Sequence, residues 1–438
     1  MRPTVMTARL VAALSLAICG LSAVAGCGDD APSPARSDSA GAPSGAAGTF
    51  SSAGNASGAG SPGTAGTTAG NSGAGSPSAG TTAGGTATAG AAGAANGGNS
   101  GASTGGANAG AAGAAGASGG AGTAGAGGGS GLADCNGVTG QPIITVGASG
   151  ASFTTVQAAL NSLSKSNNTP TQIRIAPGTY KEKLSIQVPN ITLCGQTGKT
   201  SSTILTYSDN ANTPDGNGGT LGTTNAASTN LSSNDVSVEN ITFANSTPLG
   251  GSQAVALLVS GNQVQFRNCR FLSFQDTLYV RKAKQYFRDC YMEGTVDFIF
   301  GDATAVFDNC TVKNVGGGTA ATAPNTDQAV AYGLVFLGGQ LTADTSVKAG
   351  SVALSRNWGA YGAAAFLHTT LGAHISAVGW SPMGDNTLDT ARFSEYKTSG
   401  PGAAVASRAP QSKQLTDQQA AAYTLASILG PWVPSFSK

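Results

Sequence analysis

Two aspartates, Asp276 and Asp297, have the spacing in this sequence that most suggests chemistry. Each lies seven residues after a cysteine, Cys269 or Cys290, and both cysteines belong to a repeated pattern. If the repeat folds into stacked coils, the two carboxyl groups lie on consecutive coils about 5 Å apart. Carboxylates so close do not both ionise freely, so one is pushed towards its protonated form unless another charge separates them. Such a pair suits an acid and a nucleophile, although aspartates also cap turns in β-solenoids.

The repeated pattern predicts a solenoid. Three strong copies follow at intervals of 21 and then 20 residues: Phe266-Arg-Asn-Cys-Arg-Phe271, Phe287-Arg-Asp-Cys-Tyr-Met292 and Phe307-Asp-Asn-Cys-Thr-Val312. Weaker copies occur at 188–193, 238–243 and 335–341. Short alternating strands with Asn and Gly at turns and few helix signals favour an all-β fold, a single-stranded, right-handed parallel β-helix.

The cysteines of the repeat should stack inside the solenoid. Cys269, Cys290 and Cys310 are expected to form an interior ladder of small buried side chains. A bridge between Cys290 and Cys310 is compatible with their spacing, but parallel Cβ vectors would strain it. Five cysteines remain after Cys19 and Cys27 are assigned to the N-terminal leader, which predicts at least one free thiol.

Two segments have the pattern of short capping helices, one at each end of the solenoid. Residues 153–165 place Val156, Ala159, Leu160 and Leu163 on one helical face. At the other end, residues 416–419 read as a capping box that opens a helix through Leu429, and Gly430-Pro431 ends it.

The N-terminal third has the composition of a leader and a tether. Arg2 and Arg9 precede a short apolar run, and the run ends at Val24-Ala25-Gly26-Cys27, which resembles a bacterial lipobox. We therefore expect a signal peptide over 1–27, a disordered Gly/Ala/Ser/Thr-rich tether over 28–133 and a folded domain over 134–438. Lipidated Cys27 would hold the exported protein on the bacterial cell surface or outer membrane. An ordinary cleaved signal would instead release it as a secreted protein.

Composition and motifs exclude several classes of function. The formal net charge is +1 and only 10% of residues are charged, so no basic footprint for nucleic acid is present. The two histidines, His368 and His374, have no serine nucleophile elbow nearby, which disfavours a Ser-His-Asp esterase. We expect both histidines at the surface or in turns. No metal or cofactor is expected, because the carboxylates do not follow a calcium-loop pattern.

Five segments, in order along the chain, resemble the signature segments of pectin methylesterases. They are Gly178-Thr-Tyr-Lys-Glu182, Gln253-Ala-Val-Ala-Leu257, Gln275-Asp-Thr-Leu-Tyr279, Asp297-Phe-Ile-Phe-Gly301 and Leu354-Ser-Arg-Asn-Trp-Gly359. The resemblance covers 140–436 and implies an esterase that removes methyl esters from the galacturonate units of pectin and releases methanol. Methyl-esterified homogalacturonan would be its partner, membrane contact would be through the lipid alone, and the protein would act as a monomer.

The resemblance also assigns catalytic roles. Asp297 would attack the ester carbonyl, and Asp276 would protonate the departing methanol and later activate water. Gln253 and Gln275 would stabilise the oxyanion through their amide groups. Arg356 would hydrogen-bond Asp297, lower its pKa and thereby decide which carboxyl group stays ionised.

Substrate-binding roles follow from the same resemblance. Apolar sugar faces need aromatic platforms, and the residues expected to supply the binding surface are Tyr279, Phe300, Trp358 and Met383. Tyr180 and Glu182 are expected to be structural. The chain departs from the family pattern at Ser355 and Asn357, where Gly and Pro usually flank the arginine, so the loop that places Arg356 should differ.

Two other interpretations use the same architecture. A β-helical pectate lyase or polygalacturonase would share the fold, but it would shorten the pectin chain instead of releasing methanol. A non-catalytic polysaccharide-binding module would be expected to lack the acid, the nucleophile or the arginine, and all three are present.

Overall fold

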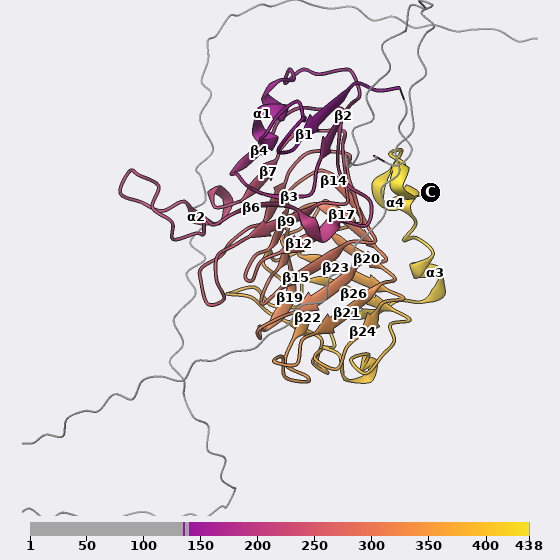
Figure 1. The fold of residues 1–438 in the computed structure, drawn as a ribbon. Helices are drawn as coiled ribbons and strands as arrows, with labels where there is room; N and C mark the ends of the chain where they lie inside the picture. Colours follow the sequence, from indigo (N-terminus) through magenta and orange to yellow (C-terminus); the bar gives the residue numbers. More distant parts are fainter. Residues whose placement is uncertain (1–134, 136–139, 438) are drawn as a thin grey trace, which may run out of the picture. The chain divides into compact units, whose positions relative to one another are not determined.

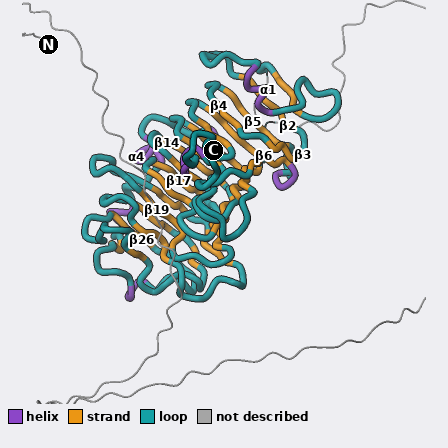
Figure 2. The backbone as a smooth tube through the Cα atoms, turned by 90° about the vertical axis from the view of Figure 1, so that its left-hand side faces the viewer, coloured by secondary structure: helices purple, strands orange, loops and turns teal. Residues whose placement is uncertain are grey.

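The described part of the computed structural model, Cys135 and residues 140–437, contains three parallel sheets wound into a parallel β-helix (Figures 1 and 2). The predicted fold class is confirmed. The first sheet contains, in spatial order, β1 (Ile143–Val146), β2 (Thr171–Ile175), β5 (Ile191–Gly195), β8 (Val236–Glu239), β11 (Val264–Arg267), β14 (Lys284–Arg288), β17 (Thr304–Asp308), β20 (Leu334–Leu337), β23 (Ala363–Leu367), β26 (Arg392–Tyr396) and β27 (Lys413–Gln414).

The other two sheets take one strand each from most coils. The second sheet contains β3 (Gly178–Lys181), β6 (Thr203–Tyr207), β9 (Thr242–Asn245), β12 (Arg270–Leu272), β15 (Tyr291–Gly294), β18 (Thr311–Asn314), β21 (Gln340–Ala343) and β24 (Thr370–Leu371). The third sheet contains β4 (Leu184–Ile186), β7 (Thr229–Leu231), β10 (Leu257–Val259), β13 (Leu278–Val280), β16 (Ile299–Gly301), β19 (Ala320–Pro324), β22 (Ala353–Arg356) and β25 (Trp380–Ser381).

Helices are short. They are α1 (Val156–Asn161), α2 (Gly222–Asn225), α3 (Asp417–Ala420) and α4 (Leu425–Leu429), with 3₁₀ turns at Thr200–Ser202, Val405–Ser407 and Ser435–Ser437. None of the helices that the structure describes is long and apolar enough to cross a bilayer.

An interior ladder of phenylalanines aligns the coils. Phe266, Phe287, Phe307, Phe336 and Phe366 stack on successive strands of the first sheet, with ring centroids 4.4–4.9 Å apart. The spacing matches that of paired strands, so each ring packs on the next one and the register is fixed by burial.

Each repeated segment spans a corner between two sheets, so the single strand implied by the pattern is wrong. The strands on either side of the corner are β11 and β12, β14 and β15, and β17 and β18. Asn268, Asp289 and Asn309 occupy these corners with φ of 51–52°, in the left-handed region that Asn and Asp tolerate. The Asn or Asp in the pattern therefore turns the chain from one sheet into the next.

The weaker copies of the repeat have different outcomes. The copies at 238–243 and 335–341 are confirmed, because Val238 pairs with Phe266 and Phe336 pairs with Phe307. The copy at 188–193 is wrong: Leu193 pairs with Val238, so Asn190 lies at a different corner from Asn240. Both corners need a left-handed residue, which made two unrelated turns similar in sequence.

The predicted cysteine ladder is confirmed. Cys269, Cys290 and Cys310 are buried free thiols, so Cys290 and Cys310 are not bridged. A disulfide that the sequence did not predict joins Cys135 to Cys194 of β5, with Cα atoms 5.6 Å apart. It ties the segment before β1 to the solenoid.

Helix α1 caps the first coils, as predicted, but is shorter than the expected 153–165. Val156, Ala159 and Leu160 are buried, and Thr155 caps the helix through its side chain. The Glu182 carboxylate accepts hydrogen bonds from the Val156 and Gln157 N–H groups, both at 2.9 Å. A carboxylate at a helix N-terminus is favourable, so the structural role expected for Glu182 is confirmed.

The C-terminal segment does not lie where the sequence suggested. The capping box at Thr416 and Gln419 is confirmed, but it opens α3 alone, and α4 is a separate helix. Both helices lie beside the first sheet (Figure 1). Ile428 and Leu429 pack on outward-facing side chains of that sheet, so the segment covers a side of the solenoid, whereas an end cap was expected.

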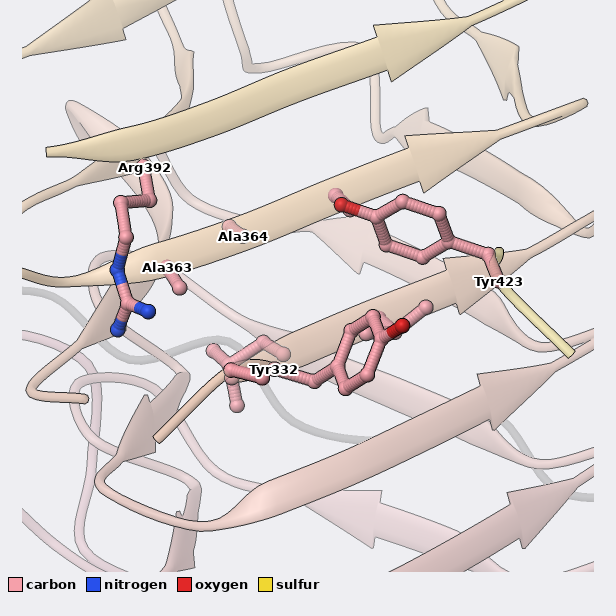
Figure 3. Close-up of a pocket in the computed structure, with 10 residues that line it drawn as sticks. Tyr332, Ala363, Ala364, Arg392 and Tyr423 are labelled. Atoms are coloured by element: carbon pink, nitrogen blue, oxygen red, sulfur yellow. The ribbon is translucent and has the colours of Figure 1, made fainter. Parts of the chain in front are cut away.

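Two further contacts fix the C-terminal segment along the sheet. Tyr423 packs edge-on against Tyr332, with ring centroids 5.3 Å apart, beside a cavity of about 40 Å³ that Arg392 also lines (Figure 3). Farther along, Phe436 N–H donates to Gln265 Oε1 at 3.1 Å. The segment thus runs back from β27 towards β11.

Candidate active site

The acidic pair lies at the edge of the third sheet, one coil apart. Leu278 pairs with Ile299, so Asp276 and Asp297 occupy equivalent positions just before β13 and β16. Their backbones are left-handed, with φ of 64° and 52°, and their side chains are almost fully buried. The predicted stacking is confirmed. Aspartate is one of the residues that tolerate this left-handed region.

Arg356 holds Asp297 from the end of β22. Arg356 Nε donates to Asp297 Oδ1 at 2.8 Å and to Oδ2 at 3.0 Å, and Nη2 makes a further short hydrogen bond to Oδ2. The guanidinium therefore reaches across the coil of β19 and binds both carboxylate oxygens. Such a bidentate contact fixes the direction of the carboxylate as well as its charge.

Burial and charge separate the two carboxyl groups. Burial raises the pKa of Asp276 well above its usual range, the Asp297 charge raises it further, and Arg356 opposes the rise. Burial also raises the pKa of Asp297, while the hydrogen bonds and charge of Arg356 oppose it. Arg356 thus lowers the pKa of Asp297 as predicted, but burial outweighs it and the pKa lies above its usual value. Asp276 still holds a proton more firmly, because the guanidinium bonds only to its neighbour.

Gln275 lies on the same coil as Asp276, and Gln253 lies on the coil before it. Gln275 precedes Asp276, and its carbonyl accepts the Ala254 N–H at 3.1 Å, which places Gln253 on the adjacent coil. Ser252 Oγ donates to Gln253 Oε1 at 2.7 Å, which leaves the amide nitrogen as the donor end. The Gln253 carbonyl also accepts the Ala211 N–H at 2.8 Å, from the protruding loop that carries α2 (Figure 1).

Aromatic side chains line the outer face of the third sheet beside the acidic pair. Tyr279 stacks on Phe300 at 4.2 Å between ring centroids, and Trp358 lies 6.0 and 5.8 Å from them. Leu278 and Val280 point into the solenoid core, so Tyr279 faces outward. Tyr279 and Phe300 are buried, whereas Trp358 is half-buried. The first two therefore form a floor, and Trp358 supplies accessible surface.

Met383 lies on a hairpin that contacts the Arg356–Trp358 loop. In this hairpin the backbones of Met383 and Asn386 form an antiparallel bridge. Asn386 Nδ2 donates hydrogen bonds to the Trp358 carbonyl at 2.8 Å and to the Asn357 carbonyl at 3.2 Å. Asn357 Nδ2 donates in turn to the Thr387 carbonyl at 2.7 Å. The structure thus brings Tyr279, Phe300 and Trp358 together, and it holds the hairpin of Met383 against the loop that carries Trp358.

The two unusual residues beside Arg356 are both buried. Ser355 Oγ donates to the Thr322 carbonyl at 3.3 Å, inside the third sheet. Asn357 makes the hydrogen bond to the Met383 hairpin, a contact that a proline at this position would lack. Sequence reasoning flagged Asn357 only as a departure and did not identify it as a link between two parts of the site.

The histidines lie outside this constellation. His368 is exposed at a left-handed turn and packs on Tyr396, as expected of a turn residue. His374 is buried, and burial lowers its pKa, so it does not lie at the surface, but it occupies a turn, the other position expected for it.

Comparisons with known proteins agree on one family. Residues 143–431 match the pectinesterase family model. The chain is 36% identical over 290 residues to "Pectinesterase 31" of Arabidopsis thaliana, which covers 64% of this chain and 89% of that one. The pectin methylesterase PemA of Erwinia chrysanthemi superposes with a TM-score of 0.63 at 32% identity, covering 68% and 99% of the two chains. A pectin methylesterase solved in complex with a hexasaccharide superposes with a TM-score of 0.63 at 31% identity, and the match covers 68% of this chain and 99% of that one.

Proposed function

The chain belongs to the pectinesterase family and is a carbohydrate esterase, and we propose that Asp297 and Asp276 carry out its demethylation of pectin as nucleophile and acid/base. The observation that carries this assignment is the bidentate contact of Arg356 with Asp297 alone. This contact favours an ionised Asp297 beside a protonated Asp276, so the two stacked carboxyl groups carry different charges.

The first half of the reaction uses that difference. Ionised Asp297 attacks the carbonyl carbon of a methylated galacturonate, and negative charge collects on the carbonyl oxygen. The amide groups of Gln253 and Gln275 stabilise this oxyanion as hydrogen-bond donors. Protonated Asp276 then gives its proton to the methoxy oxygen, and methanol leaves. An anhydride between Asp297 and the galacturonate remains.

The second half reverses the role of Asp276. Now ionised, it removes a proton from a water molecule, and the resulting hydroxide attacks the galacturonate carbonyl of the anhydride. The bond to Asp297 breaks, the sugar leaves as a carboxylic acid that gives its remaining proton to solvent, and Asp276 is protonated again. Arg356 keeps the leaving Asp297 carboxylate in place and in its charged form for the next cycle.

The aromatic cluster supports binding of the polysaccharide. Trp358 offers partly exposed ring surface above the buried pair Tyr279 and Phe300, which suits an apolar sugar face. Met383 is held near this surface by the hairpin contacts with Asn357 and Trp358. One relative was solved with a hexasaccharide, so an extended sugar chain is the substrate that we propose here.

The test is methanol release from highly methylated pectin, with the chain length of the polymer followed in parallel. We expect methanol with no change in chain length. A falling chain length without methanol would mean that the protein is a lyase or glycosidase and would overturn the proposal.

We further propose that the protein is exported and anchored through lipid on Cys27, with 28–133 as the tether; these residues lie outside the described part of the structure. The disulfide between Cys135 and Cys194 supports export, because such bonds persist in oxidising compartments. Cys27→Ala should move the protein from the detergent phase to the aqueous phase in a phase-partition assay. Equal partition of both forms would rule out the anchor.

A further inference from the structure

Arg281 is a cation at the aromatic cluster that the reaction does not use. It follows β13, and its guanidinium carbon lies 5.3 Å from the centroid of the Tyr279 ring. Leu278 and Val280 point inward, so alternation along the chain places Tyr279 and Arg281 on the same outer face. The side chain is half-buried, and part of it meets solvent beside the cluster.

The charge of Arg281 has no carboxylate partner within residues 140–437. The ion-paired arginines of that part of the chain are Arg267, Arg288, Arg356 and Arg408. The nearest carboxylate in register is that of Asp302, on the next coil, and its Oδ1 accepts the Lys282 N–H at 2.9 Å. Arg281 therefore retains donors for an external anion.

We infer that Arg281 binds a free carboxylate of a galacturonate unit remote from the reacting ester, which makes it a specificity-determining residue. This inference rests on the proposed function. Asp276 and Arg281 are five residues apart, about 16 Å along an extended chain, and Tyr279 lies between them. A sugar chain crossing Tyr279 from the acidic pair would bring a unit several places from the reacting ester to the guanidinium.

The chemistry of the substrate explains why a cation is useful at that distance. A methylated unit is neutral and is reached by Asp297, whereas an already demethylated unit carries a carboxylate. Arg281 binds the carboxylate with charge-assisted hydrogen bonds and gains nothing comparable from an ester. The enzyme would therefore prefer partly demethylated chains, and earlier demethylation would direct later turnovers to the same chain.

The test compares Arg281→Gln with the wild type on highly methylated pectin and on pectin of equal length that was partly de-esterified with alkali. We expect KM on the partly de-esterified polymer to rise about three- to tenfold, with a smaller rise on the methylated polymer. Arg281→Lys should restore part of the preference. About 0.5 M salt should reduce the difference in KM between the wild type and Arg281→Gln on the partly de-esterified polymer, because salt screens an accessible charge.

Lys282→Gln is the matched control, since it removes one positive charge from the neighbouring, exposed position. It should leave KM on both polymers within about twofold of the wild type. The inference would be overturned if KM rose equally on both polymers in Arg281→Gln. It would also be overturned if Lys282→Gln lost the preference for the partly de-esterified polymer to the same extent.

A binding measurement separates this inference from the proposed function. Calorimetric titration with a fully de-esterified oligogalacturonide needs no turnover, and Arg281→Gln should bind it about three- to tenfold more weakly than the wild type. Wild-type protein that releases no methanol would refute the proposed function alone. Unchanged affinity in Arg281→Gln would refute the role of Arg281 alone.

Discussion

The outer faces of the first and third sheets are built from the same coils but meet different partners. On the first sheet, Tyr286, Val306 and Val335 are covered by Ile428 and Leu429 of the chain's own C-terminal segment. On the third sheet, the aromatic cluster of Tyr279, Phe300 and Trp358 lies beside two buried carboxyl groups.

The difference shows how a regular solenoid separates stability from function. The part of the first sheet beneath Ile428 and Leu429 is apolar, and its burial stabilises the fold. The other face contains unfavourable charge burial that the site explains, because Asp276 and Asp297 are both buried and the pKa of each is raised. Changes to the third sheet should therefore alter turnover more than stability, and changes to the first sheet should do the reverse.

The largest effect is expected from Asp297→Asn. Asparagine keeps the shape and tolerates the left-handed backbone, where alanine would add strain. Loss of the nucleophile should lower kcat by at least about 10³-fold without lowering the melting temperature. Methanol release and thermal unfolding measure the two effects. Asp235→Asn, at an exposed left-handed position, is the control, and more than a tenth of wild-type activity in Asp297→Asn would contradict the mechanism.

Asp276→Asn should lower kcat by about 10²–10⁴-fold, the range of general acid–base catalysis, and should also stabilise the fold. Because burial raises the pKa of Asp276, the folded state binds a proton that the unfolded state has released, so wild-type stability falls as pH rises through that interval. Asparagine does not titrate, so the stability of Asp276→Asn does not fall with pH for this reason. The gain in melting temperature should therefore grow from pH 4 to pH 8, and a pH-independent difference would argue against a buried, proton-holding Asp276.

The pH dependence of wild-type activity follows from the same pair. Activity should fall on the acidic side as Asp297 is protonated, at a pH above the usual aspartate range because burial raises its pKa. It should fall on the alkaline side when Asp276 loses its proton. A kcat/KM profile from pH 4 to pH 10 would show both limbs. Activity that stays constant across that range would exclude the pair as acid and nucleophile.

Ile428→Ala probes the covered face. Ile428 is almost fully buried against the first sheet, so its truncation should cost about 2–5 kcal/mol of unfolding free energy. Methanol release by the folded protein should not change. Val433→Ala, at a position 64% exposed in the same segment, is the matched control and should stay within about 0.5 kcal/mol. If kcat fell in Ile428→Ala at a temperature where the variant is folded, the result would show that the covered face and the active-site face are coupled.

The same contrast explains what the sequence could predict. The period of the repeat located Asp276 and Asp297 on adjacent coils because stacking is a local rule that repeats. It did not locate the C-terminal helices, because an apolar helical face shows that a helix is buried but not on which surface. The bridge between Cys135 and Cys194 was equally hidden, since spacing does not determine disulfide pairing. Burial of His374 depends on a fold around it that no motif describes.

The smallest expected effect is that of Asn357→Ala, which tests how the site is held on the third sheet. Asn357 is fully buried, its Nδ2 bonds the Thr387 carbonyl, and its Oδ1 has no hydrogen-bond partner among the described residues. Loss of the Nδ2 contact should loosen the loop that carries Arg356 and Trp358 and lower kcat/KM about three- to tenfold.

Because Asn386 links the same loop and hairpin from the other side, the double variant with Asn386→Ala should lose less than the product of the two single effects. The acidic limb of the activity profile should also move to higher pH in Asn357→Ala, because a displaced guanidinium opposes the raised pKa of Asp297 less strongly. A loop that merely packs would change stability and leave that limb in place. Strictly multiplicative losses with an unmoved acidic limb would therefore show that Arg356 is positioned by β22 alone.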